Sequence, residues 1–134
     1  MSDPVPRVGL AVRSLLVCAG YYFGTLLGYA FIFPSSYISI VWPPNTLLLV
    51  ALLLSPKRQW AWLLAIAFPV HLLAQAQFGV SLKLASLYYV YDCGLLLITA
   101  GALRWFGLEV LDLRELRQSL IFIAVTTGAV AVGT

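Results

Sequence analysis

Residues 42–60 of this 134-residue chain read WPPNTLLLVALLLSPKRQW. Two prolines open an apolar run, and the run ends at Ser55-Pro56-Lys57-Arg58. Proline suits the first turn of a helix, where its missing N–H would have no intrahelical partner. The pattern predicts a helix from Pro43 to Leu54, with about 12 residues and a length of about 18 Å. The hydrocarbon core of a bilayer is about 30 Å thick, so this helix is too short to cross it.

Such a half-helix would begin part-way through the membrane, and residues 34–42 would reach it as irregular chain. Irregular backbone at that depth is tolerated only where it is buried in protein or lines a cavity. The free N–H groups near Asn45 and Thr46 would then face this cavity, and a half-helix N-terminus attracts anions and polar ligands. The alternative is that residues 37–42 are helical or interfacial, and that the prolines only kink an ordinary span.

The composition places the chain in a bilayer. Hydrophobic residues make up 62% of it and charged residues 10%, whereas soluble domains are about half apolar and a quarter charged. A soluble fold of this length leaves too much surface exposed to hide that excess. A soluble enzyme, a disordered tail and a disulfide-stapled secreted module are therefore excluded. The apolar runs are Leu15–Phe33, Ile38–Leu54, Trp60–Phe78, Leu84–Leu103 and Leu120–Val132.

These runs predict an all-α, polytopic transmembrane helix bundle with four spans and a truncated fifth. Asp112 and Glu115 are spaced as a capping pair in front of the last run. The apolar part that follows, Leu120–Val132, has 13 residues, and about 20 are needed to cross a membrane. We therefore expect residues 1–134 to be an incomplete domain, the front of a longer protein.

The basic residues predict a cytoplasmic N-terminus. With that orientation one basic residue, Lys83, falls outside, and seven fall inside, which is the charge asymmetry of an inner-membrane protein. The tryptophans agree, because Trp42 falls toward the outer side and the other three near the inner boundary. The seven inside residues are Arg7, Arg13, Lys57, Arg58, Arg104, Arg114 and Arg117.

Three glycines on the first span form a smooth helix face. Gly20, Gly24 and Gly28 are four residues apart, and small residues at this spacing let a neighbouring backbone approach closely. The neighbour is either another helix of the same bundle or the same face of a second copy, which would make a homodimer.

Polar residues at one depth suggest a ligand pocket. Counted from the inner boundary, His71 lies about 16 Å up, and Asp92 and the start of the half-helix about 18 Å up. A carboxylate in mid-membrane normally faces a partner or water, and His71 is a candidate partner. Alternatively, Asp92 is a neutral acid bonded to a tyrosine, His71 a satisfied core histidine, and Pro69 a plain kink. The hypothetical ligand-binding residues are Trp42, Asn45, His71, Gln75, Tyr88 and Asp92.

No catalytic pattern is present. The sequence lacks a phosphate-cradling glycine loop and a nucleophile beside a base, and its single histidine leaves no His-rich metal site. Its basic residues are scattered, not gathered in a stripe that would bind nucleic acid. We therefore expect no enzyme activity, cofactor, metal or nucleic-acid partner in these residues; the lipid bilayer is the expected partner.

The chain resembles the membrane-associated sensor domains of the first MASE type. Trp42-Pro43-Pro44 opens an apolar helix, Lys57-Arg58 forms a short basic turn, and Trp60 starts the next span at once. Residues 111–117, LDLRELR, are also similar. The resemblance covers most of residues 10–134. The chain departs from the pattern at Ser55-Pro56, where glycine is usual, at Asn45, and at Phe68-Pro69-Val70-His71.

The resemblance implies a bacterial integral membrane domain that supplies signal input. Such domains sit N-terminal to an output module in cis, such as a histidine kinase, a diguanylate cyclase or a phosphodiesterase. Two other interpretations stay open. A broken helix with a mid-membrane charge also fits a fragment of a transporter or channel, and the domain could be a purely structural anchor for an output enzyme.

Overall fold

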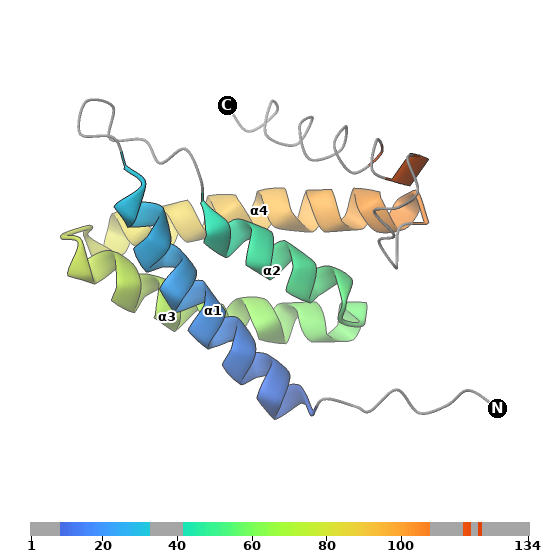
Figure 1. Cartoon of the computed structure of the whole chain (residues 1–134), viewed down its shortest axis with the longest axis horizontal. Coiled ribbons are helices and arrows are strands. Elements are labelled where there is room, and N and C mark those ends of the chain that lie inside the picture. Colours follow the sequence, from blue (N-terminus) through green and yellow to red (C-terminus); the bar gives the residue numbers. More distant parts are fainter. Residues whose placement is uncertain (1–8, 33–41, 108–116, 119–120, 122–134) are drawn as a thin grey trace.

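The computed structural model describes residues 9–32, 42–107, 117–118 and 121. Its elements are all helical, and Figure 1 shows them packed side by side. They are α1 (Leu10–Ala30), α2 (Pro43–Leu53), the short 3-10 helix η1 (Lys57–Gln59), α3 (Trp60–Gln77) and α4 (Leu82–Trp105).

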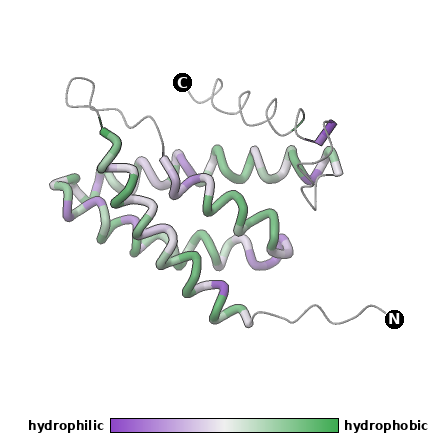
Figure 2. Tube along the Cα trace, in the orientation of Figure 1, coloured by the Kyte–Doolittle hydropathy of each residue, from purple (hydrophilic) through white to green (hydrophobic). Residues whose placement is uncertain are grey.

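Three of these helices are long and apolar enough to cross a membrane. They cover Leu10–Ala30, Lys57–Gln77 and Leu82–Trp105, and only 17%, 33% and 28% of their most apolar stretches are buried inside the bundle. Figure 2 shows hydrophobic residues along most of their length. Because so much apolar surface faces outward, the bundle needs lipid around it. The predicted fifth span and the Asp112–Glu115 cap lie outside the described residues.

Helix α2 has the predicted form of a half-helix. It has 11 residues, with the two prolines in its first turn, and is therefore about 16 Å long. It ends one residue before the predicted Leu54. The described part of the fold thus has three helices of spanning length and one that is shorter.

Helix α1 begins earlier than predicted, at Leu10 instead of Leu15, so it includes Arg13. The Arg13 side chain turns to the loop after α2, where Nη1 donates to Gln59 Oε1 at 2.9 Å and to Ser55 Oγ at 3.2 Å. Because these contacts satisfy part of the guanidinium, the helix can carry a charge near its start. Helix α4 is capped at its start by Ser81, whose Oγ accepts from the Leu84 N–H.

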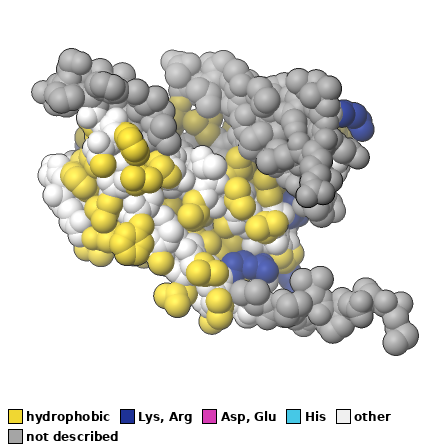
Figure 3. Space-filling view, viewed as in Figure 1, with side chains coloured by type: hydrophobic (Ala, Val, Ile, Leu, Met, Phe, Trp, Pro, Cys, Tyr) yellow, Lys and Arg dark blue, Asp and Glu magenta, His cyan; other side chains and the backbone are white. Residues whose placement is uncertain are grey.

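The four helices form a closed arrangement around one core. Helix α1 packs against α2 and α3, and α4 packs against the same two helices from the other side. Basic side chains gather at the end where α1 begins, and Figure 3 shows some of them beside an apolar face. We call this end, with Arg13, Lys57, Arg58 and Arg104, the basic end. The largest fully buried side chains are Tyr21, Leu48, Leu52, Leu63, Leu103 and His71.

The glycine face of α1 packs against α2 of the same chain. A Cβ at Gly28 would lie 2.7 Å from the Trp42 ring, and one at Gly24 would lie 3.4 Å from the backbone nitrogen of Pro44. One at Gly20 would lie 2.5 Å from the Leu47 side chain. Of the two neighbours considered for this face, the structure therefore places the helix of the same bundle there.

The other end of α2 is held by two side chains at the basic end. Arg104 of α4 donates through Nη2 to the Leu53 carbonyl at 3.2 Å and also to the Ser55 carbonyl. The Trp60 indole donates to the Leu52 carbonyl at 2.7 Å, and the guanidinium lies over its ring at 4.9 Å. The last carbonyls of a helix have no intrahelical donors, so these contacts cap α2.

Replacement of Gly28 by alanine tests the close packing of α1 on α2. We expect Gly28→Ala to lower the free energy of unfolding by about 1–3 kcal/mol, because overpacking strains both helices. Gly94→Ala is the control, since a Cβ there meets nothing within 4 Å. It should be neutral or slightly stabilising. Denaturation in mixed micelles, followed by circular dichroism, measures both. Equal effects of the two variants would contradict the packing described.

Candidate functional site

His71 lies at the centre of the bundle and joins three helices. Its side chain is fully buried. Nε2 is 3.0 Å from the Ala85 carbonyl on α4, and Nδ1 is 2.9 Å from the Tyr21 hydroxyl on α1. Because a carbonyl can only accept, Nε2 carries the proton, and Nδ1 of the neutral ring accepts from the tyrosine. His71 is therefore a satisfied core histidine, as one of the two interpretations had it.

A second tyrosine, Tyr89, extends this network to the part of α3 before Pro69. Tyr89 donates to the Leu64 carbonyl, and the Cys18 thiol on α1 lies 3.7 Å from the Ile66 carbonyl. These carbonyls lie on either side of residue 65, whose own carbonyl has no helical donor because Pro69 is four residues later. Polar side chains from both neighbouring helices thus meet α3 where proline interrupts its hydrogen bonding.

Asp92 and Asn45 form a polar pair beside this network. The Asn45 amide lies within hydrogen-bonding reach of the Asp92 carboxylate, and Tyr21 lies near the same carboxylate. Asp92 is half-buried on α4, and Asn45 is in the first turn of α2. The Asn45 Oδ1 atom is fully buried and has no hydrogen-bond partner, so it is Nδ2 that donates to the carboxylate.

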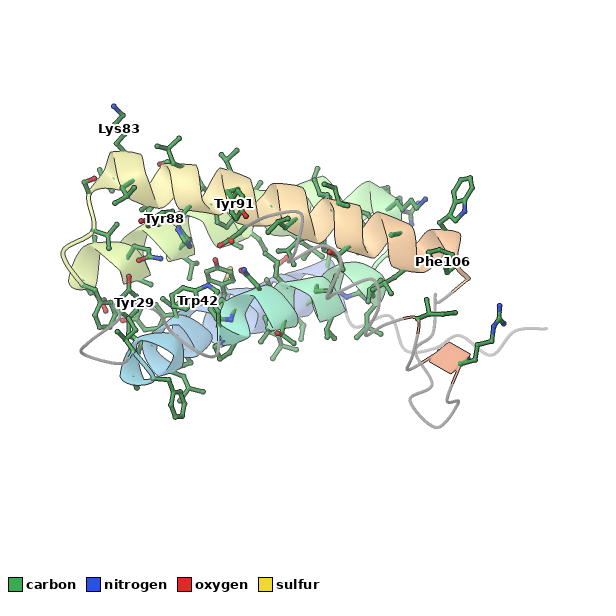
Figure 4. The ribbon with its side chains drawn as sticks, turned by 90° about the horizontal axis from the view of Figure 1, so that it is seen from above. Tyr29, Trp42, Lys83, Tyr88, Tyr91 and Phe106 are labelled. Atoms are coloured by element: carbon green, nitrogen blue, oxygen red, sulfur yellow. The ribbon has the colours of Figure 1, made fainter. Side chains whose placement is uncertain are left out.

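Aromatic rings lie on the side of this pair away from the basic end. Tyr29 packs edge-on against Trp42 at 5.7 Å between centroids and stacks on Phe78. Its hydroxyl donates to Gln75 Oε1, and it interacts electrostatically with Tyr88. Figure 4 shows Tyr29 and Trp42 close together, with Tyr88 and Tyr91 on the facing helix and Lys83 pointing away.

Of the six predicted pocket residues, the structure brings Asn45 to Asp92, and it places Trp42 and Gln75 against the same tyrosine, Tyr29. Asn45, not His71, pairs with Asp92, because both ring nitrogens of His71 are already bonded. Gln75 is buried and bonded to Tyr29. Tyr88 is 49% exposed, so it lies at the edge of the region.

Sequence reasoning missed Tyr21, Tyr29 and Tyr89, whose hydroxyls supply three hydrogen bonds of this region. A signal was available, since a buried tyrosine hydroxyl usually needs a partner. Residues 17, 21, 25 and 28 also recur at helical spacing and form the buried stripe of α1. From the sequence, Arg104 indicates only the orientation of the chain in the membrane, because no local pattern shows that its side chain reaches the end of α2.

The charges on α4 match the dipole of α2. Asp92 lies at the N-terminus of α2 and Arg104 at its C-terminus. They are 12 residues apart on α4, which is about 18 Å, and α2 is about 16 Å long. A helix N-terminus favours a negative charge and a C-terminus a positive one. Arg104 therefore places a charge of the favourable sign at the C-terminus of α2, and Asp92 does so at the N-terminus when it is ionised.

A bundle of apolar helices around a buried polar layer, with a short helix packed among them, is typical of a membrane domain. The sequence profile of the MASE1 family matches residues 13–133, and the chain belongs to this family of membrane-associated sensory domains. No curated protein and no solved structure matches the chain significantly.

Two adjacent tyrosines test the central network. Tyr21→Phe leaves the buried Nδ1 of His71 without a donor, and we expect it to reduce the free energy of unfolding by about 1–3 kcal/mol. Tyr22→Phe removes an exposed hydrogen bond to Gln77 and should change stability by less than about 0.5 kcal/mol. Chemical denaturation in micelles compares them. A Tyr21→Phe variant as stable as Tyr22→Phe would show that the His71 contact contributes nothing.

Proposed function

We propose that this domain supplies the signal input of a bacterial inner-membrane signalling protein whose output module is a histidine kinase or an enzyme of cyclic-di-GMP metabolism. The stimulus acts on the region around Asp92 and Asn45. The response is a shift of α2 relative to α4. Membership of a membrane sensory family supports the sensor role.

The observation that carries this proposal is the hydrogen bond between Asp92 and Asn45. A carboxylate at mid-membrane is costly and normally marks a functional site. Here it contacts the first turn of a helix that is too short to span the membrane. Any change in the charge or partners of Asp92 therefore alters the free energy with which α4 holds α2.

The two ends of α2 explain how such a change could be passed on. If the contact at Asp92 weakens while Arg104 keeps its hold, α2 can tilt about its basic end. Helix α3 follows α2 after the short turn around η1, and α1 packs on both. A stimulus counts as a signal only if it favours one of two arrangements over the other, and the Asp92 contact can differ between them.

The charge distribution supports an orientation with the basic end in the cytoplasm. Arg13, Lys57, Arg58 and Arg104 lie at this end, and Lys83 lies at the other. Cytoplasmic segments carry the excess of lysine and arginine. In this orientation the aromatic side of the site faces the outer half of the membrane, so a stimulus reaches Asp92 from that side.

Asp92→Asn, introduced into the protein as the cell produces it, tests the proposal. The change keeps the shape of the side chain and removes its charge. We expect the output, measured as kinase autophosphorylation or cellular cyclic-di-GMP, to change by about fivefold or more, since coupling free energies are typically about 1–3 kcal/mol. The membrane level of the protein should stay the same.

Ser86→Ala is the matched control on the same helix, because Ser86 is partly exposed and its hydroxyl donates to the Leu82 carbonyl of its own helix. It should leave the output unchanged. An unchanged output in Asp92→Asn would contradict the sensor mechanism. If Asp92→Asn instead abolished uptake or efflux of a solute with the output constant, the transporter interpretation would replace it.

A further inference from the structure

Three hydrogen-bond donors near Asp92 are paired with other acceptors. The Tyr21 hydroxyl donates to His71, the Tyr89 hydroxyl to the Leu64 carbonyl, and the His71 N–H to the Ala85 carbonyl. The one donor recorded for the Asp92 carboxylate is the Asn45 amide. A carboxylate can accept about four hydrogen bonds. These three donors near Asp92 are thus already in use.

Asn45 has a buried hydrogen-bond acceptor that lacks a donor. Its Oδ1 atom is completely buried and has no donor, and an amide oxygen in that state normally implies a missing partner. Turning the amide over would not help, because Oδ1 would then face the carboxylate oxygen. An unpaired acceptor therefore lies next to a carboxylate that can accept further hydrogen bonds.

Among the residues that the structure describes, no positive charge is found beside Asp92. Arg13 and Arg104 are bound to the turn after α2 and to its last carbonyls. Lys57 and Arg58 are exposed at the basic end, and Lys83 points away from the bundle. None of these five cations is recorded in contact with Asp92. At this depth a carboxylate is stable only with a proton or a cationic partner.

An anion does not fit this site, although a half-helix N-terminus attracts anions in general. Pro43 and Pro44 have no N–H, so two of the free donors of the first turn are missing. The partial charge of a helix N-terminus is about +0.5, and an ionised Asp92 exceeds it. With Asp92 ionised, the net local charge stays negative, which disfavours an anion and leaves a polar or cationic ligand.

Aromatic rings flank the acceptor pair on two helices. Trp42 directly precedes α2, three residues before Asn45, and Tyr88 lies one turn before Asp92 on α4. Tyr29 joins them, through its edge-on contact with Trp42 and its interaction with Tyr88. Faces of such rings attract cations. The site thus has a carboxylate, an amide oxygen and aromatic rings.

We propose that Asp92 and Asn45 recognise the protonated amine of a small organic ligand, whose apolar part lies against Trp42, Tyr29 and Tyr88. The ammonium would donate one hydrogen bond to the carboxylate and one to Asn45 Oδ1. This inference rests on the proposed function, because it names the chemical class of the stimulus for the same site.

Binding of 2-phenylethylammonium to the purified protein in nanodiscs tests the inference. This probe joins an ammonium to an aryl group, and 2-phenylethanol is its neutral counterpart. We expect saturable binding of the radiolabelled amine with a dissociation constant of about 1 mM or tighter, given its size. Unlabelled 2-phenylethanol should compete at least tenfold more weakly. Asp92→Asn and Asn45→Leu should each weaken binding by tenfold or more.

Tyr88 gives a variant that keeps the fold, because its side chain is half exposed. Tyr88→Leu should weaken binding about threefold or more through the loss of its ring, and Tyr88→Phe should bind as the parent does. The inference is overturned by absence of saturable binding, by equal competition from the alcohol, or by unchanged binding in Asp92→Asn. The last result would mean that the probe enters only the lipid or another site.

The two proposals can fail separately. If Asp92→Asn changes the output but the amine does not bind, the sensor mechanism stands and the ligand class is wrong. A proton acting alone at Asp92 would give that result. If the amine binds through Asp92 and the output is the same in Asp92→Asn, the site exists but does not control the signal.

Discussion

The ends of α2 lie inside protein because the helix is about 16 Å long in a hydrocarbon layer of about 30 Å. Its unsatisfied backbone groups cannot be left to lipid. At one end Arg104 and Trp60 donate to the last carbonyls. At the other end two prolines remove N–H groups, and Asn45 joins the helix to Asp92. The polar chemistry of the domain follows from this one short helix and its need for partners.

The other helices are arranged so that the ends of α2 have partners within the protein. The glycine face of α1 lets α2 approach until side chains of α2 meet bare backbone. Because α1 carries tyrosines on the neighbouring face, its side chains reach His71 at the centre of the bundle. Near Pro69, backbone carbonyls of α3 accept hydrogen bonds from both neighbouring helices. The Cys18 thiol of α1 donates to the Ile66 carbonyl, and the Tyr89 hydroxyl of α4 donates to the Leu64 carbonyl. The close packing of α1 on α2 and the hydrogen bonds of the buried polar groups thus stabilise each other at the same depth.

Several features of the fold were predictable because they depend on local sequence. The start of α2 at Pro43 and the spans of α3 and α4 follow from proline chemistry and from runs of apolar residues, and all three are confirmed to within a few residues. The start of α1 was wrong by five residues, since a charge at position 13 suggested a boundary. Its tertiary partners, Ser55 and Gln59, allow that charge inside the helix.

The sequence by itself determined that the chain belongs in a lipid bilayer and that one helix is too short to span it. It also predicted that Asp92, His71 and the start of that helix lie at one depth. These properties follow from composition and from the constant rise of a helix along its axis. Tertiary structure decided the partners: Asn45 for Asp92, Tyr21 for His71, and the end of α2 for Arg104. The physical reason is that depth fixes only one coordinate of a side chain. Which neighbour it meets depends on how each helix is rotated about its axis and where it crosses the others.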